Sequence, residues 1–124
     1  ARGQGMRSMA TEWARDMVHP DRIDTPVFAA VVDMISRGTP DLFAAQVEAL
    51  LNRTDATSLL PQIACPTLLL SGRQDYWSPV ERHEKMQESI QGSRLEVIEH
   101  SGHMSTMEQP EPVSLALKSW LNSQ

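Results

Sequence analysis

The order of apolar and polar residues divides the chain into two parts with different periods. From Met6 to about Leu60 the apolar residues recur at helical spacing, and they predict helices at residues 6–18, 26–37 and 40–52. Apolar stripes mark the second and third of these segments: Val27, Val31, Met34 and Ile35 in one, and Phe43, Val47, Leu50 and Leu51 in the other. We therefore expect packing or lid helices in this part, and no strands.

The second and third helices begin with the same local signal. Thr25 precedes Pro26, and Thr39 precedes Pro40, so each helix has a hydroxyl N-cap residue followed by a proline in its first turn. Gly38 ends the second helix directly before the third one starts. The capping residues thus agree with the helical period.

Beyond Pro61 the pattern becomes one of strands alternating with helices. Residues 65–72, CPTLLLSG, are a short continuous apolar run, which predicts a strand buried on both faces. Residues 78–92 predict a helix, residues 93–103 a second strand, and residues 109–123 a last amphipathic helix. This order predicts two parallel strands joined by a right-handed crossover.

The start of the helix at 78–92 carries its own signal. Ser78 is in the position of an N-cap, Pro79 follows it, and Glu81 stands three residues after the cap. That spacing predicts a capping box, in which the serine and glutamate side chains bond to backbone N–H groups of the first turn.

Composition narrows the possible partners of this 124-residue chain. Apolar residues make up 40% and charged residues 22%, as in an ordinary globular domain. The net charge of -5 comes without a basic face, which argues against nucleic acid or an anionic membrane as partner. No apolar run approaches the roughly 20 residues of a membrane span, and residues 1–20 lack the apolar centre of a secretory signal.

The single cysteine, Cys65, cannot form an intrachain disulfide and is compatible with a reducing compartment. Together with the missing signal segment, it leads us to expect a cytoplasmic protein. Cys65 stands at the start of the first predicted strand, where we expect it to be a small buried apolar residue.

The residues with the clearest chemical meaning follow the two predicted strands. Asp75 comes after the first strand and His103 after the second. The carboxyl ends of parallel strands meet at one edge of a sheet, and neighbouring strands lie about 4.8 Å apart. The two side chains can therefore come within hydrogen-bonding reach. An acid that accepts from Nδ1–H of an imidazole leaves Nε2 free to act as a general base.

Two stretches, CPTLLLSGRQDYWSP and HEKMQESIQGSRLEVIEHSGHMSTMEQPEPVSLALKSWL, resemble the C-terminal half of the α/β-hydrolase superfamily. The acid loop, the strand before the histidine, the SGH turn and the following helix start occur in the family order. The resemblance implies an α/β fold in which residues 1–61 form a helical cap-like segment and residues 62–124 a βαβα part of the hydrolase core. It also implies that Asp75 is the triad acid and His103 the triad base.

The sequence contains no G-x-S-x-G motif, which carries the nucleophile of this family upstream of the acid and histidine. The chain therefore resembles about the last half of a hydrolase acting on an ester- or lactone-type small molecule, and we expect it to be inactive alone. A serine nucleophile implies esterase or lactonase chemistry, and an aspartate implies dehalogenase or epoxide hydrolase chemistry. The resemblance implies no cofactor.

Two kinds of partner follow from this interpretation. One is a small-molecule substrate in the complete enzyme. The other is a protein surface that covers the open sheet edge and apolar helices, either a second copy in a homo-oligomer or a complementing N-terminal half. The competing hypothesis is a non-catalytic interaction module that uses the half-hydrolase fold to bind a partner.

Other candidate residues have simpler interpretations. His100 and His103 have a metal-like spacing and adjoin Glu99, but side chains on a strand that runs into a turn need not converge, so we expect no metal site. His83 lies within a predicted helix, where a surface or structural role is expected.

Several apolar side chains allow two interpretations. Trp13 and Trp77 either line a substrate site or pack against other residues. The methionines of the predicted cap either fill the core, which is our preferred interpretation, or form an adaptable lid (Met6, Met9, Met17 and Met34).

Overall fold

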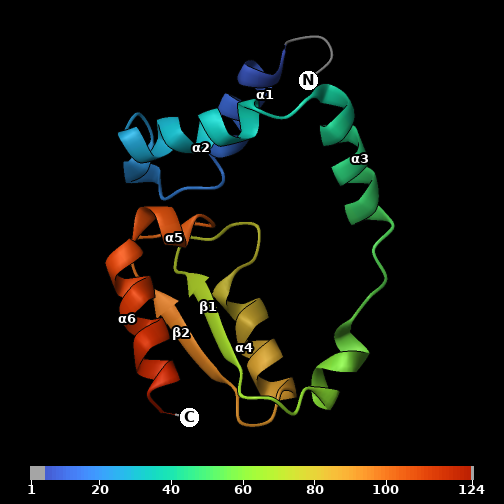
Figure 1. Ribbon diagram of the computed structural model, residues 1–124, viewed down its shortest axis with the longest axis vertical. Coiled ribbons are helices and arrows are strands. Elements are labelled where there is room, and N and C mark those ends of the chain that lie inside the picture. Colours follow the sequence, from blue (N-terminus) through green and yellow to red (C-terminus); the bar gives the residue numbers. More distant parts are fainter. Residues whose placement is uncertain (1–4, 124) are drawn as a thin grey trace.

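The computed structural model describes residues 5–123, and Figure 1 shows a helical part above a small α/β part. No helix among the described residues has the length and apolar character needed to cross a membrane. In chain order the elements are α1 (Met6–Ala14), η1 (Pro20–Arg22), α2 (Pro26–Ser36), α3 (Pro40–Leu51), η2 (Thr57–Gln62), β1 (Leu68–Gly72), α4 (Val80–Ser89), β2 (Arg94–Ile98), α5 (Ser105–Glu108) and α6 (Pro110–Leu121).

The three predicted N-terminal helices are present. Thr25 caps α2 by accepting the N–H of Phe28 at 3.5 Å, and Thr39 caps α3 by accepting the N–H of Leu42 at 3.1 Å. The first helix is shorter than the expected range 6–18. It ends at Ala14, and turns follow it.

The predicted capping box of Ser78 and Glu81 is wrong. Helix α4 begins at Val80 after Pro79, and no side chain caps its first turn. The carboxylate of Asp75 organises the preceding loop instead, by accepting the backbone N–H of Ser78. Order at this helix start therefore comes from a residue of the strand-end loop, not from the helix's own N-cap.

Strands β1 and β2 pair in parallel, as the sequence predicted, and Gly72 lies opposite Ile98. Figure 1 shows the two strands between α4 and α6, with their carboxyl ends toward the helical part. The second strand is shorter than the expected range 93–103. It ends at Ile98 because His100 adopts a left-handed backbone conformation with φ of 53°, which turns the chain.

Buried apolar side chains form two groups. One lies on α1, the following loop and α2 (Ala10, Ala14, Met17, Val18, Phe28, Val31 and Val32). The other lies in the α/β part (Val80, Ile90, Ile98 and Val113). Trp77, Met104 and Met107 pack against the first group, so the residues around the strand ends contact the helical core.

Two expectations about burial are wrong. Residues 68–70 of β1, which were expected to be buried on both faces, are only half-buried, because β1 has one neighbouring strand among the described residues. Cys65, which was expected to be buried, is exposed. Helix α3 is also poorly covered. It has no buried residue, and Leu50 and Leu51 are 58% and 80% exposed. An apolar stripe and a strand edge are therefore open to solvent.

Two glycines allow close backbone approaches, Gly72 to the turn after β2 and Gly102 to the loop after α1. A Cβ atom on Gly72 would overlap the carbonyl oxygens of Ser101 and Gly102, and one on Gly102 would lie 2.9 Å from the carbonyl oxygen of Met17. The obstructing atoms are backbone atoms, which cannot rotate away. A larger residue at either position would push apart the segments that meet there.

We predict that Gly72→Ala lowers the free energy of unfolding by about 1–3 kcal/mol, as overpacking does in a close-packed interior. Gly38→Ala is the matched control, because its Cβ would first meet the Ile35 carbonyl oxygen at 3.3 Å. Urea unfolding compares the two variants. Equal losses at both positions would contradict the close approach at Gly72.

Candidate active site

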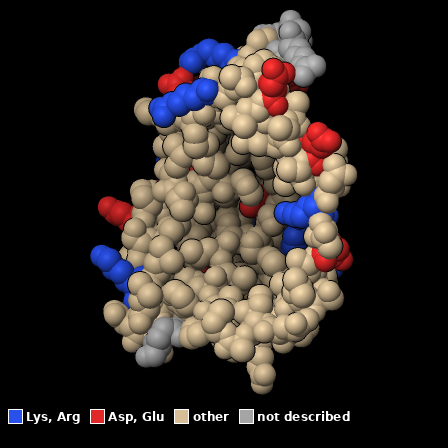
Figure 2. Space-filling view, turned by 45° about the vertical axis from the view of Figure 1, so that its right-hand side comes forward, with Lys and Arg blue, Asp and Glu red and all other residues tan. Residues whose placement is uncertain are grey.

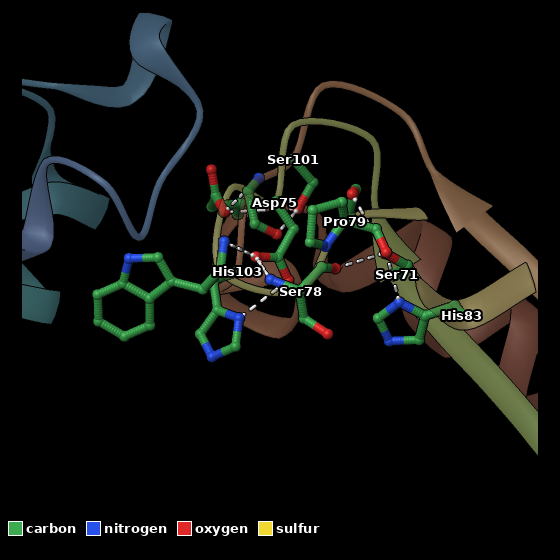
Figure 3. Close-up of polar contacts among 11 residues, drawn as sticks. Ser71, Asp75, Ser78, Pro79, His83, Ser101 and His103 are labelled. Carbon is green, nitrogen blue, oxygen red and sulfur yellow. Dashed lines mark hydrogen bonds and ion pairs between the residues drawn. The ribbon is translucent and has the colours of Figure 1, made fainter. Parts of the chain in front are cut away.

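Asp75 and His103 meet above the carboxyl ends of the two strands. Asp75 lies in the loop between β1 and α4, and His103 lies in the turn after β2. The Nδ1 atom of His103 is 2.9 Å from Oδ2 of Asp75, and Figure 3 shows the carboxylate turned toward the imidazole. The expected hydrogen-bonding reach is confirmed, while the catalytic role of the pair stays a prediction.

The two oxygens of the Asp75 carboxylate bind different groups. Oδ1 accepts the backbone N–H groups of Trp77 and Ser78, each at 2.9 Å, and so orders the loop before α4. Oδ2 faces the imidazole of His103. The residue is only 8% exposed, and its hydrogen bonds offset the cost of burying a carboxylate. The acid is therefore fixed in position before any ligand arrives.

His103 is the accessible member of the pair. Its side chain is 38% exposed, whereas that of Asp75 is 6% exposed. When Nδ1 carries the proton and donates it to Asp75, Nε2 has a free lone pair. The arrangement can therefore take up a proton at Nε2 and stabilise the resulting imidazolium.

Two further pairs of residues join the loops that carry Asp75 and His103. The backbone N–H of Gln74 donates to the carbonyl of Ser101 at 2.8 Å, and the N–H of Ser101 donates to Oε1 of Gln74 at 3.1 Å. Nearer the solvent, Nη2 of Arg73 lies 2.6 Å from Oε1 of Glu99. This hydrogen bond lowers the pKa of Glu99 below its ordinary value, and it raises the pKa of Arg73.

Sequence reasoning missed Glu108, which is 3% exposed. Its Oε1 accepts the backbone N–H of His19 at 2.6 Å. Its Oε2 accepts the N–H of Gly102 at 2.9 Å and lies 3.4 Å from the hydroxyl oxygen of Ser101. The only available signal was the presence of an acid in the short segment after His103, and nothing in the local pattern marks it as buried.

A row of aromatic rings runs from α3 to the histidine. The ring centroids of Phe43 and Trp13 are 5.1 Å apart, those of Trp13 and Trp77 are 4.9 Å apart, and those of Trp77 and His103 are 5.2 Å apart. The two tryptophans therefore pack against each other, and Trp77 also flanks the imidazole. Packing of both tryptophans is confirmed, while a role in lining a substrate site stays a prediction.

A cavity of about 370 Å³ lies at one end of this row, between α1, α2 and α3. Its apolar lining includes Met6, Trp13, Met34, Ile35, Leu42 and Phe43. Met17 belongs to the buried core instead. The methionines are thus divided between core filling and the wall of a cavity.

The remaining candidate residues are not gathered at the site. The ring of His100 lies near that of His19, with centroids 5.9 Å apart. Nδ1 of His83 donates to the carbonyl oxygen of Pro79, the residue before α4, at 3.2 Å. Over residues 5–123, no three His, Cys, Asp or Glu side chains are grouped as a metal site.

Sequence comparison finds hydrolases that match part of the chain, although no family model matches it. A putative carbamate hydrolase RutD from Pseudomonas savastanoi is 33% identical over 70 residues, which are 56% of this chain and 27% of that protein. A pimeloyl-(acyl-carrier protein) methyl ester esterase from Neisseria meningitidis is 31% identical over 87 residues, 70% of this chain and 34% of that protein.

Structure comparison gives matches along nearly the whole chain. A thermophilic esterase from Thermogutta terrifontis matches 97% of this chain with a TM-score of 0.88 and 34% identity, and the match covers 45% of the esterase. An enol-lactonase from Burkholderia xenovorans matches 98% of this chain with a TM-score of 0.86 and 21% identity, and the match covers 46% of that protein. The chain thus spans less than half of these proteins.

We predict that Asp75→Asn changes the tautomer of His103. The asparagine oxygen can still accept the N–H groups of Trp77 and Ser78, but its amide then donates to Nδ1 of His103 and moves the ring proton to Nε2. Imidazole ¹⁵N chemical shifts report the tautomer. The control is Asp55→Asn.

Asp55 is a suitable control because its Oδ1 also accepts a backbone N–H two residues on, that of Thr57, at 2.9 Å. An Nδ1-protonated His103 in Asp75→Asn, unchanged from the parent and the control, would contradict the hydrogen bond between Asp75 and His103.

Proposed function

The chain matches the C-terminal half of the α/β-hydrolase superfamily in sequence and in fold, and from this we propose that it supplies the acid and base of a hydrolase active site. The substrate is a small-molecule ester or lactone. The observation that carries the proposal is the hydrogen bond between Asp75 and His103 on the loops after two adjacent parallel strands. In α/β sheets, working residues gather at this edge.

The proposed reaction needs a nucleophile from outside these 124 residues, since the chain has no G-x-S-x-G motif. With a serine nucleophile, Nε2 of His103 removes the hydroxyl proton as the oxygen attacks the carbonyl carbon. The proton then passes to the leaving group, and an acyl intermediate remains. His103 next activates the water that hydrolyses this intermediate. Asp75 stabilises the imidazolium in both steps.

An aspartate nucleophile would use the same pair for its second step only. A carboxylate attacks without losing a proton, so His103 would act solely on the water that cleaves the ester intermediate. This version corresponds to dehalogenase or epoxide hydrolase chemistry. We favour the serine version because the curated relatives and the solved neighbours named above include an esterase, a carbamate hydrolase and a lactonase.

The apolar cavity between α1, α2 and α3 supports a substrate with an apolar group. Its volume of about 370 Å³ is within the range of small-molecule pockets. Trp13 lines the cavity and contacts Trp77, which flanks His103. We propose that the two tryptophans guide the apolar group of the substrate from the cavity toward the reacting carbonyl.

We propose that the uncovered surface receives the N-terminal part of a hydrolase core. The free edge of β1 offers backbone N–H and C=O groups to another strand, and Leu50 and Leu51 offer apolar surface. Beside them is a cavity of about 610 Å³ lined by residues of α3, the loop after it, η2 and α4, with Arg53, Asp55 and Arg82 among them. Figure 2 shows this face hollowed, with basic side chains at the right-hand side of the hollow and residues other than Lys, Arg, Asp and Glu over most of the rest. We also propose a cytoplasmic location, which the exposed thiol of Cys65 supports.

The same open surface favours a second candidate, a non-catalytic interaction module. In that case a partner would cover the edge of β1 and the apolar side of α3, and Asp75 and His103 would serve only to hold two loops together. The two candidates differ in whether the pair is needed for turnover.

A chimera tests the catalytic proposal. Residues 1–124 replace the matching 45% of the Thermogutta terrifontis esterase, so that the rest of that enzyme supplies the missing part. We predict hydrolysis of p-nitrophenyl acetate, which His103→Ala or Asp75→Asn lowers by about 10³–10⁴-fold in kcat. His83→Ala is the matched control and keeps the activity.

The chimera also separates the two candidates. A folded, monomeric chimera whose activity is the same with and without His103 would contradict the catalytic proposal. A folded chimera without turnover, in which the chain still covers its partner, would favour the interaction module.

For the 124-residue chain alone we predict no catalysis and self-association. Its hydrolysis of p-nitrophenyl acetate should not exceed that of its His103→Ala variant, because no nucleophile is present.

The sedimentation of the isolated chain should give a dimer or a larger species, because a second copy covers the open strand edge and the apolar stripe of α3.

The chimera should sediment as a monomer, because its N-terminal part covers the same surface. A single species near 13.9 kDa for the isolated chain at micromolar concentration would contradict the predicted association.

A further inference from the structure

Glu108 is, apart from Asp75, the only buried acidic side chain among the described residues. A buried carboxylate is costly unless donors surround it. Here the backbone N–H of His19 lies 2.6 Å from Oε1, and the backbone N–H of Gly102 lies 2.9 Å from Oε2. The hydroxyl of Ser101 adds a longer contact of 3.4 Å. These donors come from two segments far apart in the sequence.

The two segments are the loop after α1 and the turn that carries His103. They also touch without help from Glu108, because the N–H of Met104 donates to the carbonyl of Met17 at 3.1 Å. His103 lies between Gly102 and Met104. The N–H of Gly102 is bound by Glu108, and the N–H of Met104 is bound by the carbonyl of Met17. The backbone on both sides of the histidine is therefore fixed to the helical part of the molecule.

We infer that Glu108 is a positioning residue for His103. It sets the place of the turn at residues 101–104 by binding this turn and the loop after α1 with opposite oxygens of one carboxylate. The hydrogen bond of 2.9 Å between His103 and Asp75 tolerates little displacement, so a shift of the turn weakens it. Figure 3 shows Ser101, Asp75 and His103 close together in this region.

The role is indirect, because the oxygens of Glu108 face backbone donors and not the imidazole. The inference rests on the proposed function only where it concerns turnover. The geometry that Glu108 controls, the hydrogen bond between His103 and Asp75, can be measured without a nucleophile.

Glu108→Gln tests the inference in the 124-residue chain. Glutamine has nearly the same size, but its amide brings an N–H donor against the N–H of His19 or Gly102. The readout is the Nδ1–H proton of His103, which resonates far downfield when it is bound to a carboxylate. We expect this resonance to be lost or shifted upfield in Glu108→Gln.

Two controls separate positioning from a general loss of stability. Glu111→Gln removes an exposed acid from the first turn of α6 and should leave the resonance unchanged. Val113→Ala creates a cavity at a residue that is 4% exposed, so it should lower the midpoint of urea unfolding yet keep the resonance.

A second pair of variants tests the contact between Glu108 and the N–H of His19 by changing His19. His19 has φ of -57°, which proline can adopt, so His19→Pro removes the N–H that Glu108 accepts. His19→Ala removes the imidazole but keeps this N–H. We expect His19→Pro to weaken the His103 resonance and His19→Ala to preserve it.

The outcome decides the role of Glu108 even if Glu108→Gln does not fold, because the His19 pair then carries the test. An unchanged His103 resonance in both Glu108→Gln and His19→Pro, or in His19→Pro alone if Glu108→Gln is unfolded, overturns the inference.

The chimera distinguishes this inference from the proposed function. We expect Glu108→Gln there to lower kcat at least 10-fold with little change in KM. An inactive chimera whose His103 resonance still depends on Glu108 would refute the proposed function and leave the positioning role intact.

Discussion

The hydrogen bond between Asp75 and His103 links two loops, and the surrounding backbone makes that link possible. Parallel pairing of β1 and β2 brings both strand ends to one edge of the sheet. Gly72 lets the first loop lie directly against residues 101 and 102. The reciprocal bonds between Gln74 and Ser101 then hold the loops in register. The acid and the imidazole meet because the backbone beneath them has almost no freedom to separate.

The helical part of the molecule contributes to the same geometry. Glu108 and the carbonyl of Met17 attach the histidine turn to the loop after α1, and Trp77 packs between the histidine and Trp13. The helical part therefore also supports the turn that carries His103. A displacement of α1 would also displace His103, because Glu108 and the row of aromatic rings connect the two.

Local signals in the sequence were sufficient for most elements and for the main pair of residues. Thr25 and Thr39 mark helix starts through short-range bonds to their own helices, so their role is readable from neighbouring residues. The alternation of strand and helix after Pro61 likewise predicted the parallel pair, and with it the meeting of Asp75 and His103. The failures involve contacts between distant segments. Ser78 does not cap α4, and its backbone N–H is bound by Asp75, not by Glu81. The donors of Glu108 include His19, which lies 89 residues away.

Burial of β1 could not be predicted from its composition either, because burial depends on what covers the strand as well as on the strand itself. We propose that His103 is the base of a hydrolytic site completed by a nucleophile from outside this chain. A crystal structure of the esterase chimera after reaction with a phosphonate ester tests it most directly. We predict a covalent adduct on the nucleophile, with Nε2 of His103 within about 3 Å of the nucleophile's oxygen and Nδ1 still bound to Asp75. An adduct with His103 turned away from that oxygen, or one held by a different base, would contradict it.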